Sequence, residues 1–183
     1  WGVENAVKKF IGMFAFALYD RRDHVLYLVR DRLGIKPLYW GSFNKKLVFG
    51  SEVKALRQTP GWQARIDRGS VSSFMRHNYI PSPFSIYEDV RKLEPGTILK
   101  ITGDGNVTVN RYWDLVSIAA ENISNRTDVD ENQMLSELDE LLSDSVRRRL
   151  VSDVVLCSRD QFDRPGNVVR DACHTDSESR KSQ

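Results

Sequence analysis

The sequence RDRLGIKPLYW, residues 30–40, carries two arginines, a lysine and an aspartate around one glycine and one proline. It joins two apolar stretches, HVLYLVR at 24–30 and PLYWG at 37–41, whose composition is typical of strands. Gly34 permits a backbone conformation that other residues avoid. Asp31 can accept hydrogen bonds from N–H groups of the turn or from the neighbouring cations. The sequence therefore predicts a charged connection that braces the ends of two strands.

Outward from this connection, residues 1–114 are predicted to be rich in strands. GMFAFALYD (12–20) is almost continuously apolar, which indicates a strand covered on both faces. Further strands are expected at 37–41 and 46–51, and within 93–101 and 107–113, the last two joined by a Gly-Asp-Gly hairpin tip. Residues 2–10 are expected to be the end of an amphipathic helix, and further helices are expected at 52–58 with Ser51 as the cap and at 68–77 with Asp67 as the cap. YIPSPFSIY (79–87) contains too much proline for regular structure.

Residues 115–183 differ from the first part of the chain in composition and in apolar pattern. Residues 115–130 have few apolar anchors and predict a linker, whereas 130–150 shows the apolar period of a helix, with Asp130 and Gln133 resembling a capping pair. The arginine run 147–149 suits the negative end of that helix, and the alternative that it binds phosphate stays open. From about Val154 the sequence has no periodic apolar content, which predicts disorder.

Composition excludes several classes of protein. The chain has 183 residues, of which 40% are hydrophobic and 28% charged, and its net charge is +2. That charge is too small to indicate a nucleic-acid or membrane-surface protein, and no apolar run is long enough for a membrane span. The histidines, His24, His77 and His174, have no metal-ligand spacing, and both cysteines, Cys157 and Cys173, lie in the C-terminal tail. We expect a cytoplasmic protein without nucleic-acid or membrane partners.

Five motifs, in this order and at these separations, resemble the glutamine-hydrolysing asparagine synthetases. They are GMFAFALYD (12–20), RDRLGIKPLYWG (30–41), SEVKAL (51–56), LEPGT (93–97) and RYWD (111–114). Together they resemble the second half of the N-terminal glutaminase domain, and SVRRRLVSDV (145–154) resembles the helix that opens the C-terminal synthetase domain. The resemblance predicts an α+β fold, in part a two-sheet sandwich of the N-terminal-nucleophile type with flanking helices.

The resemblance also implies a reaction. In this family an N-terminal cysteine attacks the side-chain amide of glutamine, and the ammonia that leaves crosses to a synthetase domain. There ATP and Mg²⁺ adenylate the side chain of aspartate, and ammonia displaces AMP. A thiolate divides amide hydrolysis into two easier acyl transfers, and adenylation gives the carboxylate a good leaving group. On the resemblance, the charged connection either braces the fold or helps to shape the ammonia route.

The chain departs from the family pattern at both sites. Residue 1 is Trp, and no cysteine precedes Cys157, so the nucleophile is missing. The Ser-Gly-Gly-x-Asp-Ser nucleotide loop should follow SDV (152–154), where this chain has VLCSRDQFDRPGNVV. We therefore assign no catalytic, cofactor-binding or metal-binding residue, and expect neither ATP nor Mg²⁺ to bind this chain.

These observations predict four segments. Residues 1–114 are the C-terminal part of the amidotransferase domain, 115–130 a linker, 131–154 the start of the synthetase domain, and 155–183 a disordered or frameshifted tail. The chain is then an inactive gene remnant that could associate with its missing halves, encoded nearby in other frames. The alternatives that stay open are a true short protein acting as a binding or regulatory module, and a fragment of an amidotransferase for another carboxylate such as a sugar acid.

Overall fold

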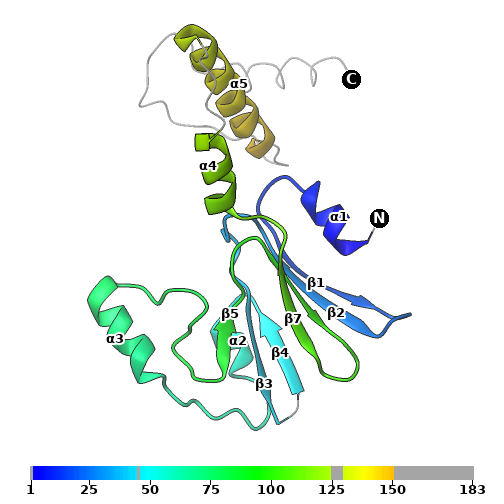
Figure 1. Ribbon diagram of the computed structural model, residues 1–183. Helices are drawn as coiled ribbons and strands as arrows, with labels where there is room; N and C mark the ends of the chain where they lie inside the picture. The colour runs from blue at the N-terminus through cyan, green and yellow to red at the C-terminus, as the bar shows by residue number, and fades with distance from the viewer. Residues whose placement is uncertain (1, 45, 125–129, 151–183) are drawn as a thin grey trace, which may run out of the picture. The chain divides into compact units, whose positions relative to one another are not determined.

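The computed structural model describes residues 2–44, 46–124 and 130–150. The chain divides into two compact units, Trp1–Ser124 and Asn125–Gln183, each treated by itself (Figure 1). The predictions for residues 151–183, including the tail from 155, lie outside the described residues. None of the helices in the described ranges is long and apolar enough to cross a membrane.

The first unit contains two antiparallel sheets. The four-stranded sheet has the order β1-β2-β6-β7, and its strands are β1 (Ala15–Asp20), β2 (Val25–Arg30), β6 (Thr97–Ile101) and β7 (Val107–Arg111). The three-stranded sheet has the order β4-β3-β5, with β3 (Tyr39–Phe43), β4 (Lys46–Gly50) and β5 (Val90–Lys92). Four helices accompany them: α1 (Val3–Lys8), α2 (Val53–Leu56), α3 (Arg68–His77) and α4 (Leu115–Ser124). The predicted strands and the predicted Gly-Asp-Gly hairpin between β6 and β7 are confirmed, whereas β5 was not predicted.

The two sheets face each other across a leucine core. Leu28 of β2 and Leu99 of β6 are fully buried against Leu38, which precedes β3, and Trp40 of β3 packs on the same cluster. Alternate residues of a strand point to opposite faces, so the next residues along β2 and β6 face the other way. The four-stranded and three-stranded sheets are therefore the two inner layers of a sandwich.

Helices cover parts of the two outer faces. Val7 of α1 is buried against Val29 of β2 and Ile98 of β6, on the outer face of the four-stranded sheet. On the outer face of the three-stranded sheet, Leu56 of α2 is buried with Phe43 and Val90. The order helix, sheet, sheet, helix confirms the predicted α+β sandwich with flanking helices (Figure 1).

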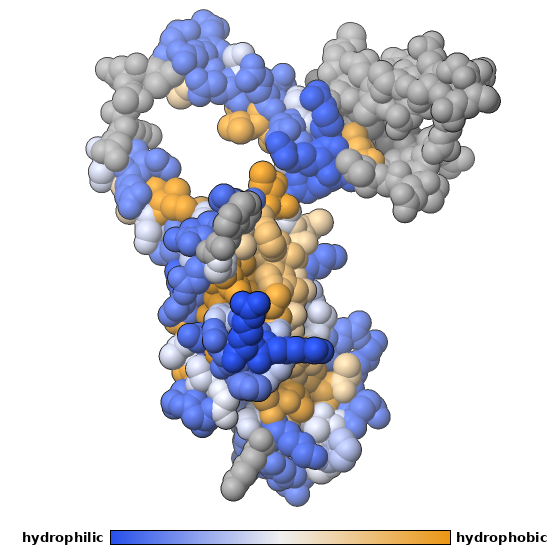
Figure 2. All heavy atoms as spheres, turned by 90° about the vertical axis from the view of Figure 1, so that its right-hand side faces the viewer, coloured by the Kyte–Doolittle hydropathy of each residue, from blue (hydrophilic) through white to orange (hydrophobic). Residues whose placement is uncertain are grey.

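Strand β1 corrects one prediction. It was expected to be covered on both faces, but among the described residues it pairs only with β2, and residues 17–19 in its middle are exposed. Leu18 is 45% exposed and Tyr19 is 55% exposed. Figure 2, which views the side of the unit that carries β1, shows apolar atoms at the surface. An apolar run therefore predicted the strand correctly but not its burial.

Two further predictions about helices were wrong in detail. Helix α2 begins after Glu52, not Ser51, and Glu52 makes no side-chain capping bond. Within the predicted linker, Leu115–Ser124 form α4, a helix without a buried residue. Apolar residues recur within α4 at helical spacing, but the Ser, Asn, Asp and Thr residues that follow in the same stretch favoured a linker for all of 115–130. The division of the chain into domains stays a prediction.

Two predicted helix starts can be compared directly. Asp67 caps α3 as predicted, since its side chain accepts a hydrogen bond from the backbone N–H of Gly69. Helix α5 (Glu131–Arg149), in the second unit, begins after Asp130 as predicted, but the Asp130 side chain makes no capping bond. Gln133, the expected capping partner, instead donates to Glu137.

Candidate functional site

The connection between β2 and β3 is organised by a buried carboxylate. Asp31 is 1% exposed, and its two carboxylate oxygens accept hydrogen bonds from the backbone N–H groups of Ile35 and Lys36, each at 2.9 Å. The turn closes because the N–H of Gly34 donates to the carbonyl oxygen of Asp31 over 3.1 Å. The predicted hydrogen bonds that Asp31 accepts from N–H groups of its own turn are confirmed.

The backbone of Asp31 joins this turn to two other segments. Its N–H donates to the carbonyl oxygen of Phe14, just before β1, over 2.9 Å. Its carbonyl oxygen also accepts from the N–H of Gly96, just before β6, over 2.9 Å. One aspartate therefore fixes the starts of two strands relative to the end of β2.

Arg30 extends the brace across the fold. Its buried guanidinium donates from Nε to the carbonyl oxygen of Lys36 (2.9 Å), from Nη2 to that of Gly34 (2.6 Å) and from Nη1 to that of Leu93 (2.5 Å). Burial lowers the pKa of Arg30, while the nearby charge of Asp31 acts in the opposite direction. The guanidinium therefore crosslinks the turn to the segment after β5.

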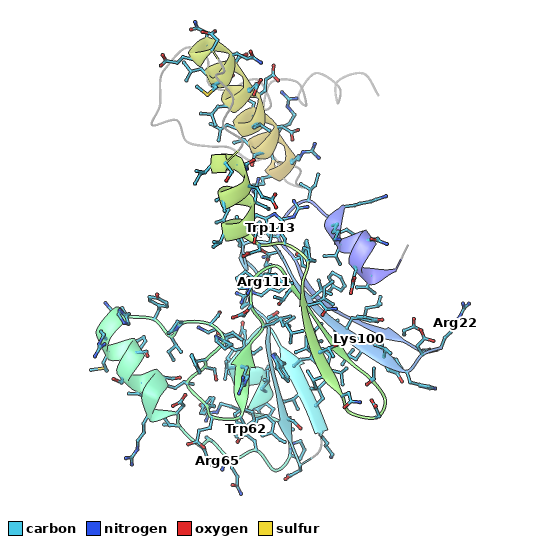
Figure 3. The ribbon with its side chains drawn as sticks, in the orientation of Figure 1. Arg22, Trp62, Arg65, Lys100, Arg111 and Trp113 are labelled. Atoms are coloured by element: carbon cyan, nitrogen blue, oxygen red, sulfur yellow. The ribbon has the colours of Figure 1, made fainter. Side chains whose placement is uncertain are left out.

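Tyr112 completes the brace from the end of β7. Its phenol donates to the carbonyl oxygen of Arg30 over 2.9 Å, and its N–H donates to the carbonyl oxygen of Gly96 over 2.9 Å. Burial raises the pKa of Tyr112 to about 12, so the phenol keeps the proton it donates at neutral pH. Arg111 and Trp113, on either side of it, are labelled in Figure 3.

Gly34 is required by both conformation and space. Its φ is +67°, in the left-handed region where side chains are disfavoured. A Cβ atom there would lie 2.7 Å from Cγ of Pro95 and 3.0 Å from Cζ of Arg30. Any larger residue would therefore push against the guanidinium that holds the connection together.

Arg32 ties the same connection to α1. It donates from Nη2 to the carbonyl oxygen of Lys8, the last residue of that helix, over 2.8 Å. Three charged side chains of this connection, those of Arg30, Asp31 and Arg32, thus contact backbone groups of the fold, as the brace hypothesis predicted. The alternative role, in shaping an ammonia route, stays a prediction.

A pocket of about 260 Å³ lies beside the brace. It is lined by Arg30, residues 37–39, residues 79–82 and Lys92. The amine of Lys92 donates to the carbonyl oxygen of Ile80 and so fixes the proline-rich segment against β5. The sequence gives no sign of this pocket, because 62 positions separate its two cations and no motif joins them.

The other residues singled out from the sequence do not gather into a site. His24 lies within hydrogen-bond distance of the Tyr19 hydroxyl, at 3.0 Å, and the ring of His77 lies 6.1 Å from that of Tyr79. Among the described residues, no three histidine, cysteine or acidic side chains could hold a metal ion together. His174, Cys157 and Cys173 lie outside the described residues. The prediction that the chain carries no catalytic or cofactor-binding residue stays a prediction.

Comparison with known proteins gives a consistent assignment. The family described as "Glutamine amidotransferase domain" matches residues 1–113, which include the whole brace. Asparagine synthetase [glutamine-hydrolyzing] 1 of Bacillus subtilis is 33% identical over 151 residues, covering 82% of this chain and 23% of the relative. Asparagine synthetase [glutamine-hydrolyzing] 3 of the same organism is 32% identical over 156 residues, covering 85% of this chain and 24% of the relative.

An archaeal relative gives the same result. Putative asparagine synthetase [glutamine-hydrolyzing] 2 of Methanocaldococcus jannaschii is 31% identical over 153 residues, covering 82% of this chain and 28% of the relative. The chain spans about a quarter of the length of these curated relatives. It belongs to the glutamine amidotransferase domain family, and over most of its length it is similar to these glutamine-hydrolysing asparagine synthetases.

Proposed function

We propose that residues 1–113 serve glutamine-dependent asparagine formation, as part of the domain that releases ammonia from glutamine. The observation that carries this proposal is the amidotransferase family match over the whole two-sheet sandwich. The names of the relatives favour aspartate as the acceptor over another carboxylate. In the complete reaction, ATP and Mg²⁺ activate the acceptor carboxylate, and we assign their binding to no residue of this chain.

The role of this chain within that domain is structural. The matched residues contain no cysteine, so they supply no thiol to attack the amide of glutamine. Their contribution is the brace of Asp31, Arg30 and Tyr112, which fixes where the strands begin and end. We therefore propose that the chain alone does not hydrolyse glutamine. A preparation that releases glutamate from glutamine would contradict this proposal.

The apolar stripe of helix α5 is an argument for a second domain. Leu135, Leu138 and Leu142 recur on this helix at intervals of three and four, and each is more than half exposed within the described residues. We propose that 131–154 opens a synthetase domain whose other elements cover this apolar stripe. Association with separately encoded halves and a cytoplasmic location are proposals of the same kind.

A chimera tests the amidotransferase assignment. Residues 1–113 would replace the matching segment of the Bacillus subtilis asparagine synthetase 1, leaving the rest of that enzyme intact. We expect the chimera to form asparagine with glutamine as the nitrogen donor. Free ammonia as the donor is the internal control, because it bypasses glutamine hydrolysis. A chimera that forms asparagine from ammonia but not from glutamine would contradict the proposal.

A further inference from the structure

Two cations from different sheets line the pocket beside the brace. Arg30 ends β2 of the four-stranded sheet, Lys92 ends β5 of the three-stranded sheet, and the proline-rich segment 79–82 lines the same pocket. Within the parts of the chain that the structure describes, none of the ion pairs includes either cation. The pocket therefore gathers positive charge without an acidic partner at salt-bridge distance.

Asp31 is the acidic group nearest in sequence to this pair, and it is committed elsewhere. Its two carboxylate oxygens accept hydrogen bonds from the backbone N–H groups of Ile35 and Lys36. Its negative charge favours the charged form of Arg30. The pKa of Lys92, by contrast, is shifted by burial and by the positive charge of Arg30. The charge of Lys92 is therefore the less compensated of the two.

Both cations have donor capacity beyond their bonds to the protein. A guanidinium has five N–H bonds, and three carbonyl oxygens accept from Arg30. An ammonium has three N–H bonds, and the carbonyl oxygen of Ile80 accepts from Lys92. Burial lowers the pKa of Lys92, and the positive charge of Arg30 lowers it further. A bound anion would oppose both effects by stabilising the charged form of the amine.

We propose that this pocket binds a small oxyanion, a carboxylate or a phosphate group, between Arg30 and Lys92. Its volume of about 260 Å³ is many times the ~15 Å³ that one water molecule needs, so an oxyanion with a short substituent fits. Charge-assisted hydrogen bonds from both cations would hold the ligand. The site is independent of the amidotransferase assignment, since it uses neither glutamine nor a thiol.

Competitive acetylation of lysines tests the proposal on the full chain. A limiting amount of an amine-reactive acetyl ester would be added in sodium chloride, in phosphate or in acetate at equal ionic strength, and each lysine would be followed by peptide mass spectrometry. A ligand that covers Lys92 divides its labelling rate by 1 + [L]/Kd, so the rate halves when the anion concentration equals Kd. Lys100 of β6, labelled in Figure 3, is the internal control, because the alternation along β6 places it on the face opposite the leucine core.

We expect labelling of Lys92, but not of Lys100, to fall as phosphate or acetate replaces chloride. Protection by phosphate alone or by acetate alone identifies the preferred oxyanion. Equal labelling of Lys92 in all three salts would overturn the proposal, as would an equal fall at both lysines. Absence of labelling at Lys92 in chloride would also overturn it, because small solutes would then not reach the amine.

A pair of variants separates binding from a change in fold. Lys92→Met should abolish the heat of phosphate or acetate binding in titration calorimetry, whereas Lys100→Met should leave it unchanged. Circular dichroism spectra of both variants should match that of the parent. Binding that persists in a folded Lys92→Met protein would overturn the assignment of the site to this pocket.

Discussion

Arg30 donates a hydrogen bond over 2.5 Å to the carbonyl oxygen of Leu93, 63 residues further along the chain. Leu93 follows β5, and its own side chain is buried in the leucine core between the two sheets. The same guanidinium also holds the turn at residues 34–36. The charged connection is therefore a joint between the sheets, and changes within it should affect the whole first unit.

In the chimera, Gly34→Val should destabilise the protein by about 1–3 kcal/mol, because it places a side chain at positive φ. The added atoms would also displace the Arg30 guanidinium. Gly105→Val is the matched control, since Gly105 also has positive φ but a Cβ there would meet nothing within 4 Å. Urea unfolding should show a larger loss for Gly34→Val than for Gly105→Val.

The same substitution in the chimera distinguishes the two roles of the connection. If the connection is a brace, glutamine hydrolysis and ammonia-dependent asparagine formation should fall together with stability. Survival of both half-reactions with loss of their coupling would contradict the brace. The ratio of glutamate released to asparagine formed measures that coupling.

Tyr112 should make stability sensitive to alkaline pH. Its pKa is about 12 in the folded chain because of burial, against 10.0 as its ordinary value. The folded state therefore holds the proton more tightly than the unfolded state, and ∂ΔG/∂pH of unfolding is negative between those values. The contribution is complete below pH 10 and is lost as the pH rises to about 12.

The variant Tyr112→Phe tests this dependence. It lacks the titrating group, so its free energy of unfolding should be lower than that of the parent at pH 9 and should decline less steeply between pH 10 and 12. Urea unfolding at several pH values measures both quantities. Parallel declines in the parent and in Tyr112→Phe would show that other groups determine the alkaline behaviour.

The exposed strand β1 should promote self-association. Leu18 and Tyr19 are exposed on a strand with one described partner, and such an edge can pair with another chain. The purified chain should therefore aggregate or unfold in a broad, weakly cooperative transition. Leu18→Lys should reduce association in sedimentation velocity, because a charge on an edge strand opposes pairing.

Leu33→Lys is the control for that substitution. Leu33 is 63% exposed and lies in the connection rather than in a strand, so the added charge should leave association unchanged. A sharp, reversible thermal transition of a monomeric parent chain would contradict the edge argument and favour a self-standing module.

Two helix starts provide a matched pair of substitutions. Asp67→Ala should cost about 1 kcal/mol, because the carboxylate accepts hydrogen bonds from the N–H of Gly69 and the hydroxyl of Ser70. Asp130→Ala removes an aspartate from the same position of α5, where no side-chain capping bond exists. Helix content and unfolding free energy should fall for Asp67→Ala only. Equal losses in both variants would indicate that charge near the helix start, rather than the bond, is responsible.

Local patterns allowed much of the fold to be predicted from the sequence. All the described strands except β5, and the cap at Asp67, follow from residue types within a few positions, and the motifs indicated the sandwich. Features that depend on distant segments were not predictable. The exposure of Leu18 depends on which strands are its neighbours, and the pocket depends on Lys92 approaching Arg30 across two sheets. The α4 helix was not predicted because the polar residues that follow it dominate the composition of 115–130, although its own apolar residues have helical spacing.

The order of synthesis determines when the hydrogen bond from Arg30 to Leu93 can form. The chain is made from its N-terminus, so the turn at residues 34–36 leaves the ribosome before its acceptor at residue 93 exists. Until then the guanidinium has only the two local carbonyl oxygens of Gly34 and Lys36. Closing so long a loop is a late and entropically costly event. The joint between the sheets therefore cannot be completed co-translationally before β5 has emerged, and a nascent chain halted earlier would expose the inner faces of β2 and β3.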